Sequence, residues 1–292
     1  MRTRGFFTTR KIQLIALLIL IVIVSIGYVS YSYLRDQQSM RARDTQQQAE
    51  NTRIANERAT VAAIEAKKKA PVTITLPGAQ PFRAIVDDYT QPSSLWTIVS
   101  KTYAIPLTYV PVQLVVPDVE ERSDKSIAER SVRSDVAAPL KAMFVAAAND
   151  GHALMIGSAY RSATLQALYF NNYSAISGAE AANQYSAHPG ESEHQTGLAV
   201  DISTVSRNCY LNECFTNTPD GQWLATNAYM YGFTLRYPKD KETITGYQFE
   251  PWHYRYVGID LATALHESGM TLDEAWPYLQ TALTTLKQNG AI

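Results

Sequence analysis

An uncharged run of 23 residues, spanning residues 12–34, constrains this chain more than any other feature of its sequence. As a helix it would span roughly 34 Å at about 1.5 Å per residue, enough to cross a hydrocarbon core of about 30 Å. A cleaved signal peptide would have a shorter apolar run followed by a small-residue cleavage site, and a buried core helix would need apolar partners nearby. We therefore expect residues 12–34 to form a transmembrane signal anchor.

The charges around this run predict its orientation. Basic side chains precede it at Arg2, Arg4, Arg10 and Lys11 and follow it at Arg35, Arg41 and Arg43. Since short flanking segments rich in Lys and Arg tend to stay inside, the first group predicts a cytoplasmic tail over residues 1–11. The second group opposes this orientation without reversing it. We expect a single-pass protein of the cell membrane with the bulk of the chain outside the cytoplasm.

Residues 35–72 predict a polar stalk. The segment is rich in Gln, Arg, Ala and Glu and contains no Gly or Pro before Pro71. Its few large aliphatic residues do not make the three or four heptads that a coiled coil needs. Both a solvated helix and a disordered spacer fit this composition.

The charge balance changes sharply along the chain. Residues 1–70 carry 12 Lys and Arg against 5 Asp and Glu, whereas residues 71–292 carry 14 against 22. The larger part is therefore acidic, which argues against a nucleic-acid-binding surface there.

The pattern of residues 73–292 predicts one α+β domain. Short runs rich in Val, Ile, Thr and Tyr, bounded by Pro and Gly, are typical of short strands. Apolar residues at three- and four-residue spacings predict helices at 131–150, 163–173, 220–231, 261–268 and 272–288. Strands and helices do not alternate regularly, so we expect a small mixed or antiparallel sheet with flanking helices.

The chain has two cysteines, Cys209 and Cys214, separated by four residues. Outside the cytoplasm, a small disulfide-closed loop is the first interpretation of such a pair. Half of a zinc site is the alternative, although the sequence offers no second pair of cysteines to complete it.

Two histidine contexts carry the chemistry: His194 lies in SEHQTGLAVD, which ends at Asp201, and His253 ends the sequence EPWH, which begins at Glu250. Imidazole and carboxylate are ligands that zinc accepts, and catalytic zinc sites commonly have three protein ligands and an open position. His194, Asp201 and His253 could supply the three ligands. Glu250 would then be free to act as a general base.

The spacing alone leaves this hypothesis open. In extended chain, residues three or seven apart face opposite sides, so the ligands converge only if the chain bends. Pro251 and Gly197 are the residues that can provide the two bends. The alternative is that the chain does not bring these residues together, with His194 exposed and His253 packed beside Trp252.

Three segments, in order, resemble the bacterial D-alanyl-D-alanine carboxypeptidases of the VanY type. SAYRS at 158–162 with Gln166 resembles the YRSxxxQ segment, and PGESEHQTGLAVDI at 189–202 resembles the SxHxxGxAxD zinc motif. The run at 231–258 resembles the closing segment that ends in ExWH. Weaker similarity extends from about Leu95 to Leu279. One departure is Val99-Ser100-Lys101, where the family often has V-N-K.

The resemblance implies an α+β zinc metallopeptidase fold and an enzyme outside the cytoplasm that acts on peptidoglycan stem peptides. Carried over by position, the resemblance implies that His194, Asp201 and His253 are the zinc ligands and that Glu250 is the catalytic base. It implies that Arg161 binds the substrate carboxylate and the developing oxyanion. Gln166 and Ser192 match the polar residues that hold the terminal D-Ala.

The sequence therefore predicts a membrane-anchored zinc carboxypeptidase that removes the terminal D-Ala from stem peptides. An L,D-carboxypeptidase acting on stem tetrapeptides shares the same motifs and remains an alternative. A catalytically silent, zinc-containing wall-binding module is a second alternative. The presence of Glu250 argues against it, because a structural metal site has no use for a base at that position.

Overall fold

The computed structural model describes residues 6–292, with side chains described from residue 11 onward. The chain divides into two units, the second of which is Lys68–Ile292. Residues 1–5, which carry part of the predicted cytoplasmic tail, lie outside the described residues.

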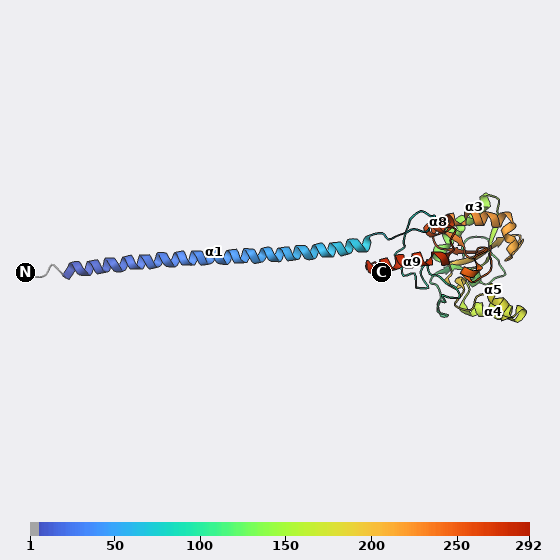
Figure 1. Ribbon diagram of the computed structural model, residues 1–292, viewed down its shortest axis with the longest axis horizontal. Helices are drawn as coiled ribbons and strands as arrows, with labels where there is room; N and C mark the ends of the chain where they lie inside the picture. Colours follow the sequence, from blue (N-terminus) through green and yellow to red (C-terminus); the bar gives the residue numbers. More distant parts are fainter. Residues whose placement is uncertain (1–5) are drawn as a thin grey trace, which may run out of the picture. The chain divides into compact units, whose positions relative to one another are not determined.

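A single helix, α1 (Phe6–Lys69), makes up almost all of the first unit (Figure 1). Glycine occurs once in it and proline never, so little interrupts the backbone hydrogen bonds. Arg53 adds ion pairs to Glu50 and Glu57, three and four residues away. The apolar side chains within residues 12–34 are exposed, and by length and composition this is the candidate membrane span among the described residues. The stalk is helical in the structure to Lys69.

The second unit contains a four-stranded antiparallel sheet in the order β5-β6-β8-β7. Its strands are β5 (Leu154–Ser158), β6 (Ala199–Thr204), β8 (His253–Tyr256) and β7 (Phe233–Leu235). Two smaller antiparallel pairs are β1 (Thr73–Ile74) with β2 (Phe82–Arg83), and β3 (Leu114–Val115) with β4 (Val132–Arg133). The predicted α+β class with a small antiparallel sheet is confirmed.

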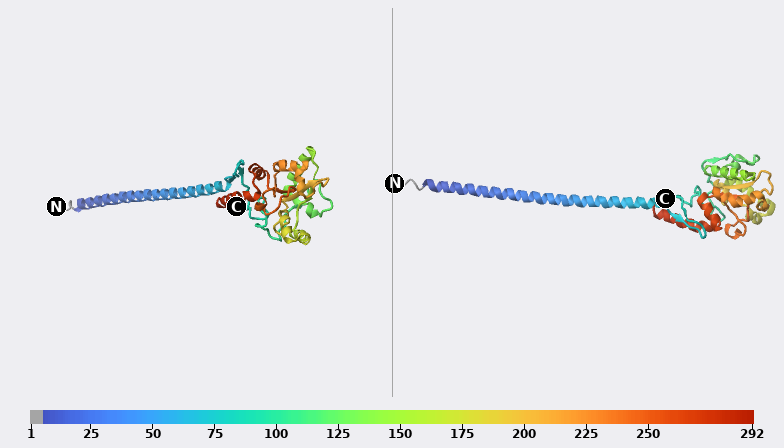
Figure 2. Two further views of the ribbon diagram at one scale, coloured as in Figure 1. Left: turned by 45° about the vertical axis from the view of Figure 1, so that its right-hand side comes forward. Right: turned by 90° about the horizontal axis from the view of Figure 1, so that it is seen from above.

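Helices surround this sheet in the second unit, and α3 and the α4–α5 pair lie on opposite sides of it (Figures 1 and 2). The α-helices are α2 (Ile127–Arg130), α3 (Ser134–Asn149), α4 (Ala163–Ser177), α5 (Ala179–Tyr185), α6 (Pro219–Asn227), α7 (Glu242–Thr245), α8 (Ile259–Ser268) and α9 (Leu272–Gln288). Short 3₁₀ helices are η1 (Glu193–Thr196), η2 (Glu213–Asn217) and η3 (Ala228–Tyr231).

The helix predictions differ from the structure mainly at their ends. The last helix has the predicted bounds, 272–288. The helix expected to begin at residue 131 begins at Ser134 instead, because Val132 and Arg133 pair with β3 as strand β4. Helix α5 was not expected from the pattern of apolar residues.

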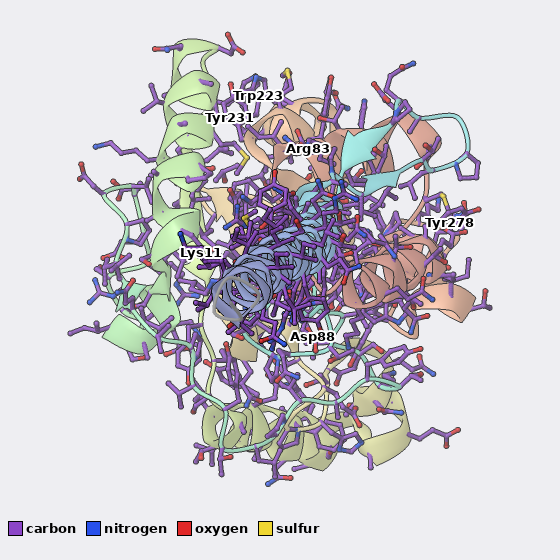
Figure 3. All side chains as sticks on the ribbon, turned by 90° about the vertical axis from the view of Figure 1, so that its left-hand side faces the viewer. Lys11, Arg83, Asp88, Trp223, Tyr231 and Tyr278 are labelled. Atoms are coloured by element: carbon purple, nitrogen blue, oxygen red, sulfur yellow. A yellow bond between two sulfur atoms is a disulfide. The ribbon has the colours of Figure 1, made fainter. Side chains whose placement is uncertain are left out.

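One apolar core lies between α3 and one face of the sheet. Its buried members include Val136, Leu140, Met143, Ile156, Val200 and Ile202. Because side chains alternate along a strand, Asp201 lies on the opposite face of β6 from Val200 and Ile202. At the edge of this core, Trp223 and Tyr231 stack with ring centroids 6.5 Å apart (Figure 3). A second core joins α8 and α9 to β1, β2 and Trp96.

Candidate metal centre and substrate cleft

Asp201 and His253 meet because they are register partners on the neighbouring strands β6 and β8. Residues directly opposite in an antiparallel pair place their side chains on the same face. The Oδ1 atom of Asp201 lies 3.3 Å from Nδ1 of His253. Strand pairing therefore brings together two of the three predicted ligands, which are far apart in the sequence.

His194 reaches the same point from η1. Gly197 ends this 3₁₀ helix with φ +70°, a left-handed conformation that glycine adopts without strain, and the chain then turns into β6. The Nδ1 atom of His194 is hydrogen-bonded to the carbonyl of Ala159, and Nε2 lies 3.3 Å from Oδ1 of Asp201. The bend that the spacing requires is thus present at Gly197.

The three side chains fit a bound zinc ion. Their candidate ligand atoms all lie within 4.8 Å of one another, and His194 Nε2 and Asp201 Oδ1 are buried without a hydrogen-bond partner. Buried polar atoms without partners are costly, and a cation between them would satisfy both. Two imidazoles and one carboxylate are also a common ligand set for zinc with an open position.

The protonation of the two imidazoles differs. Burial lowers the pKa of His194 to about 4, so this ring is neutral at pH 7, the form that binds a metal. Burial also opposes a proton on His253, but the nearby carboxylates of Asp201 and Glu193 outweigh it and raise the pKa to about 9. A cation bound here would displace that proton, since a metal needs the free nitrogen.

Glu250 approaches this cluster through a turn at Pro251. The backbone N–H of His253 donates to the carbonyl of Glu250 at 3.1 Å, which closes the turn. Oε2 of Glu250 consequently lies 3.4 Å from Nδ1 of His253, the nitrogen that also faces Asp201. Burial raises the pKa of Glu250 to about 7, and the negative charge of Asp201 adds to this.

Arg161 contributes a positively charged side chain to the site. It follows β5, and its backbone N–H donates to the carbonyl of His194 at 3.2 Å. Its guanidinium lies 3.6 Å from Oδ2 of Asp201 and donates to Oε1 of Gln166 at 3.1 Å. Gln166 in turn donates to the carbonyl of Ala187 at 2.8 Å. The orientation of Arg161 is therefore fixed from two sides.

A cavity of about 290 Å³ connects these groups and is called the substrate cleft below. All seven residues singled out for catalysis, substrate binding or metal binding line it: Arg161, Gln166, Ser192, His194, Asp201, Glu250 and His253. Tyr173, Tyr185, Tyr237, Tyr247, Leu211 and Trp252 are among the residues that complete the lining. The cleft thus combines a cluster of charged groups with a lining that is largely aromatic.

Sequence reasoning missed a buried ionic cluster behind His253. Oε1 of Glu193 accepts hydrogen bonds from Nε of Arg236 at 2.8 Å and from a terminal nitrogen of Arg255 at 2.7 Å. Its other oxygen, Oε2, lies 3.7 Å from Nε2 of His253. Arg236 continues the cluster to Asp273 at the start of α9. Glu193 directly precedes His194 and Arg255 follows His253 by two residues, but nothing in the sequence shows that they are buried.

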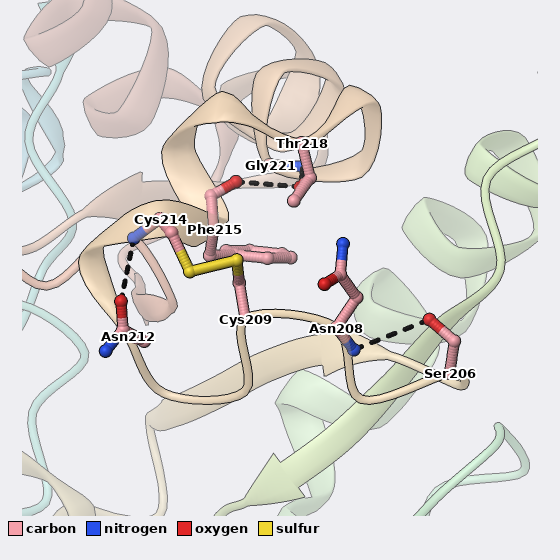
Figure 4. The surroundings of a disulfide bond; sticks show 8 residues. All are labelled: Ser206, Asn208, Cys209, Asn212, Cys214, Phe215, Thr218 and Gly221. Atoms are coloured by element: carbon pink, nitrogen blue, oxygen red, sulfur yellow. Dashed lines mark hydrogen bonds between the residues drawn. A yellow bond between two sulfur atoms is a disulfide. The ribbon is translucent and has the colours of Figure 1, made fainter.

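The two cysteines lie apart from the metal cluster. Cys209 and Cys214 form a disulfide that closes the loop after β6 (Figure 4). The loop's Asn212 accepts a hydrogen bond from the backbone N–H of Cys214 at 3.0 Å. Both sulfur atoms are used in this bond, so the structure does not contain the zinc half-site considered as the alternative.

The sequence matches a known protein family and several of its relatives. Residues 129–259 match the family described as VanY, D-alanyl-D-alanine carboxypeptidase. YodJ of Bacillus subtilis (strain 168) is 47% identical over 183 residues, which cover 63% of this chain and 67% of YodJ. The D-alanyl-D-alanine carboxypeptidase of Enterococcus faecalis (strain ATCC 700802 / V583) is 39% identical over 151 residues, and the chain spans about half (53%) of that relative.

Solved structures show the same similarity. The LdcB LD-carboxypeptidase superposes with a TM-score of 0.61 at 46% identity, covering 64% of this chain and 87% of that one. A mutant of the vancomycin-resistance D,D-pentapeptidase VanY, in complex with Zn(II), superposes with a TM-score of 0.52 at 33% identity, covering 64% of this chain and 99% of that one.

Proposed function

The chain belongs to the VanY family of carboxypeptidases, and we propose that it is a zinc-dependent enzyme that removes the terminal D-Ala from peptidoglycan stem peptides. The observation that carries the proposal is the convergence of His194 Nε2, Asp201 Oδ1 and His253 Nδ1 in one cleft. Glu250 and Arg161 lie within reach of the same point. No other group of His, Cys, Asp and Glu among the described residues offers a comparable metal site.

Each residue has a distinct part in this proposal. Zinc, when bound by His194, Asp201 and His253, would supply the Lewis acidity that makes water a nucleophile at neutral pH. Glu250 accepts a proton from the attacking water and passes it to the amine of the departing D-Ala. Its carboxylate is not needed as a fourth ligand, and its position beside Nδ1 of His253 suits a base acting next to the metal.

Arg161 and its neighbours suit the carboxylate end of the substrate. A guanidinium stays charged at all relevant pH values and can bind a carboxylate or an oxyanion through two N–H groups. Gln166 accepts a hydrogen bond from Arg161, and Ser192 is a polar side chain that lines the same cleft. We propose that these three residues bind the terminal D-Ala.

The bond that is cut has two candidates. Removal of D-Ala from a D-Ala-D-Ala end follows from the similarity to D-alanyl-D-alanine carboxypeptidases. Cleavage of the L,D bond of a tetrapeptide is the second candidate, and the higher identity to the LdcB LD-carboxypeptidase, 46% against 33%, favours it.

We further propose that residues 12–34 of α1 anchor the protein in the cell membrane, with the N-terminus inside and the second unit outside. Protease treatment of intact cells, followed by detection of tags at both ends, tests this orientation. Loss of the C-terminal tag alone would support it, and protection of the C-terminal tag would contradict it.

The test of the enzymatic proposal uses the purified full chain in detergent. Synthetic stem pentapeptide and tetrapeptide are incubated with and without a zinc chelator, and the products are identified by mass spectrometry. Chelator-sensitive loss of one D-Ala supports the proposal, and the peptide that is cut identifies the bond. The variants His194→Ala and His253→Ala should lose zinc by elemental analysis. Stable zinc binding without cleavage would instead support the silent wall-binding module.

A further inference from the structure

The loop that follows β6 returns to the metal ligands. The hydroxyl of Tyr210 donates to the carbonyl of Gly157 at 3.1 Å. Gly157 lies at an irregularity of β5, immediately before Ser158, which pairs with Asp201. A Cβ atom at residue 157 would lie 3.1 Å from the Tyr210 ring and 3.3 Å from the Asp201 carbonyl oxygen. The tyrosine therefore packs directly beside the strand position that carries a metal ligand.

Two kinds of contact hold the same loop in place. Arg122 donates to the Tyr210 hydroxyl at 2.8 Å, and its guanidinium lies 4.9 Å from the ring centroid. On the other side, the Cys209–Cys214 disulfide closes the loop over Phe215, which is buried in the core (Figure 4). Leu211 lies inside the disulfide ring, directly after Tyr210.

The backbone of this loop is strained. Arg207, Cys209 and Leu211 have φ values of +58°, +54° and +47°. Left-handed conformations are uncommon for residues other than glycine, and they persist where the surroundings enforce them. Here the disulfide and the Tyr210 contacts provide that enforcement. The result is that the half-buried side chain of Leu211 lines the substrate cleft together with Trp252.

We propose that Leu211 determines specificity by contacting the side chain of the substrate residue on the acyl side of the cleaved bond. This inference rests on the proposed function, in which Arg161, Gln166 and Ser192 bind the departing D-Ala. We place the acyl-side residue along the rest of the described lining, where Leu211 is the one leucine beside Trp252 and four tyrosines. An aliphatic contact of this kind favours a long aliphatic side chain, such as that of a diamino acid, over a methyl group.

The test compares peptides that end in D-Ala and differ only in the residue before it. Lysine and alanine are placed there in both the L and the D configuration, so that either bond specificity can be read. For the full-length protein we expect Leu211→Ala to raise KM for the lysine peptide about tenfold, the usual effect of removing methyl groups from an apolar pocket. We expect kcat, zinc content and KM for the alanine peptide to stay within about twofold.

Three further variants separate this role from a general effect on folding. Leu211→Met keeps an apolar side chain of similar volume and should restore KM for the lysine peptide. Ile259→Ala, an exposed aliphatic residue at the start of α8, should leave every parameter unchanged. Replacing both cysteines by serine should raise KM in the same direction as Leu211→Ala, because the loop is then released.

The outcomes are distinct. Equal changes for the lysine and alanine peptides, or no change for either, would overturn the role of Leu211 while leaving the proposed function intact. A wild-type protein that binds zinc but cleaves none of the four peptides would overturn both. Loss of zinc in Leu211→Ala would assign the residue to the stability of the metal site instead.

Discussion

Two buried glutamates flank His253, and their surroundings are opposite. Glu193 shares one carboxylate oxygen between Arg236 and Arg255, and all three side chains are fully buried. Among the described residues no Lys or Arg forms an ion pair with Glu250, and its one charged partner is His253, at 3.4 Å. Burial alone would raise both pKa values. For Glu193 the two arginines outweigh burial and hold the pKa well below its usual range, whereas the pKa of Glu250 rises to about 7.

The difference shows how one residue type serves two purposes in a single site. A carboxylate fixed by two guanidinium groups keeps its charge and its position, which suits a residue that supports His253 from behind. A carboxylate buried without an arginine or lysine has a pKa near neutral pH and can both bind and release a proton there, which suits a residue in the cleft. Substitutions of the two glutamates, and of the Asp273 that pairs with Arg236, test this difference directly.

The largest effect should come from Glu250→Gln. Glutamine keeps the shape of the side chain but cannot accept the proton, so we expect kcat to fall by about a thousandfold. Zinc content should stay at the wild-type level, and the free energy of unfolding should fall far less than in Glu193→Gln, because Glu250 has no Lys or Arg partner to lose among the described residues. Steady-state kinetics with elemental analysis measures both. Wild-type turnover in this variant would show that Glu250 is not the base.

Glu193→Gln should affect stability most. It leaves Arg255 buried without an anion and Arg236 with Asp273 alone, and removal of one partner of a buried ion pair typically costs about 3–5 kcal/mol. Urea unfolding in the presence of a chelator measures the loss without a contribution from metal. If the free energy of unfolding falls no more than in Glu250→Gln, the two glutamates do not differ as the structure indicates.

The same Glu193→Gln variant should also bind zinc less tightly. Oε2 of Glu193 faces Nε2 of His253, and loss of such a supporting group typically weakens metal binding by about 10- to 100-fold. Competition with a chromophoric chelator gives the dissociation constant. An unchanged constant would restrict Glu193 to the stability of the fold.

The smallest effect is expected for Asp273→Asn, at the outer end of the ionic cluster. Asp273 is partly exposed and accepts from Arg236, which keeps Glu193 as its main partner. We expect a loss of about 1 kcal/mol in the free energy of unfolding, with kinetics and zinc affinity near wild type. A loss as large as that of Glu193→Gln would mean that the cluster behaves as one unit.

Local patterns in the sequence were sufficient for several elements of the fold. The last helix has its predicted bounds, and its start carries the reciprocal capping of Thr271 and Glu274 that a T-x-x-E sequence indicates. Helix α5 follows α4 after the single residue Gly178, and its Ala-rich sequence has little apolar periodicity to indicate it. The formation of α5 therefore depends on its packing against α4 and not on its own sequence pattern.

The site depended more on tertiary structure. The motifs indicated which residues meet, and the need for bends at Gly197 and Pro251 followed from the alternation of side chains. The pairing of Asp201 with His253 across two strands could not be derived, because strand register joins positions 52 residues apart. The burial of Glu193 and Arg255 was equally hidden, since charged residues usually lie at the surface.

The contact between Gly157 and Tyr210 has a consequence for evolution. Any side chain at position 157 would meet the tyrosine ring and the backbone of β6, so position 157 cannot gain a side chain freely while the tyrosine is kept. Among homologous sequences we expect the two positions to co-vary, with larger residues at 157 only where a small residue replaces the tyrosine. A lineage that alters its substrate preference through this loop would carry paired substitutions at these two sites.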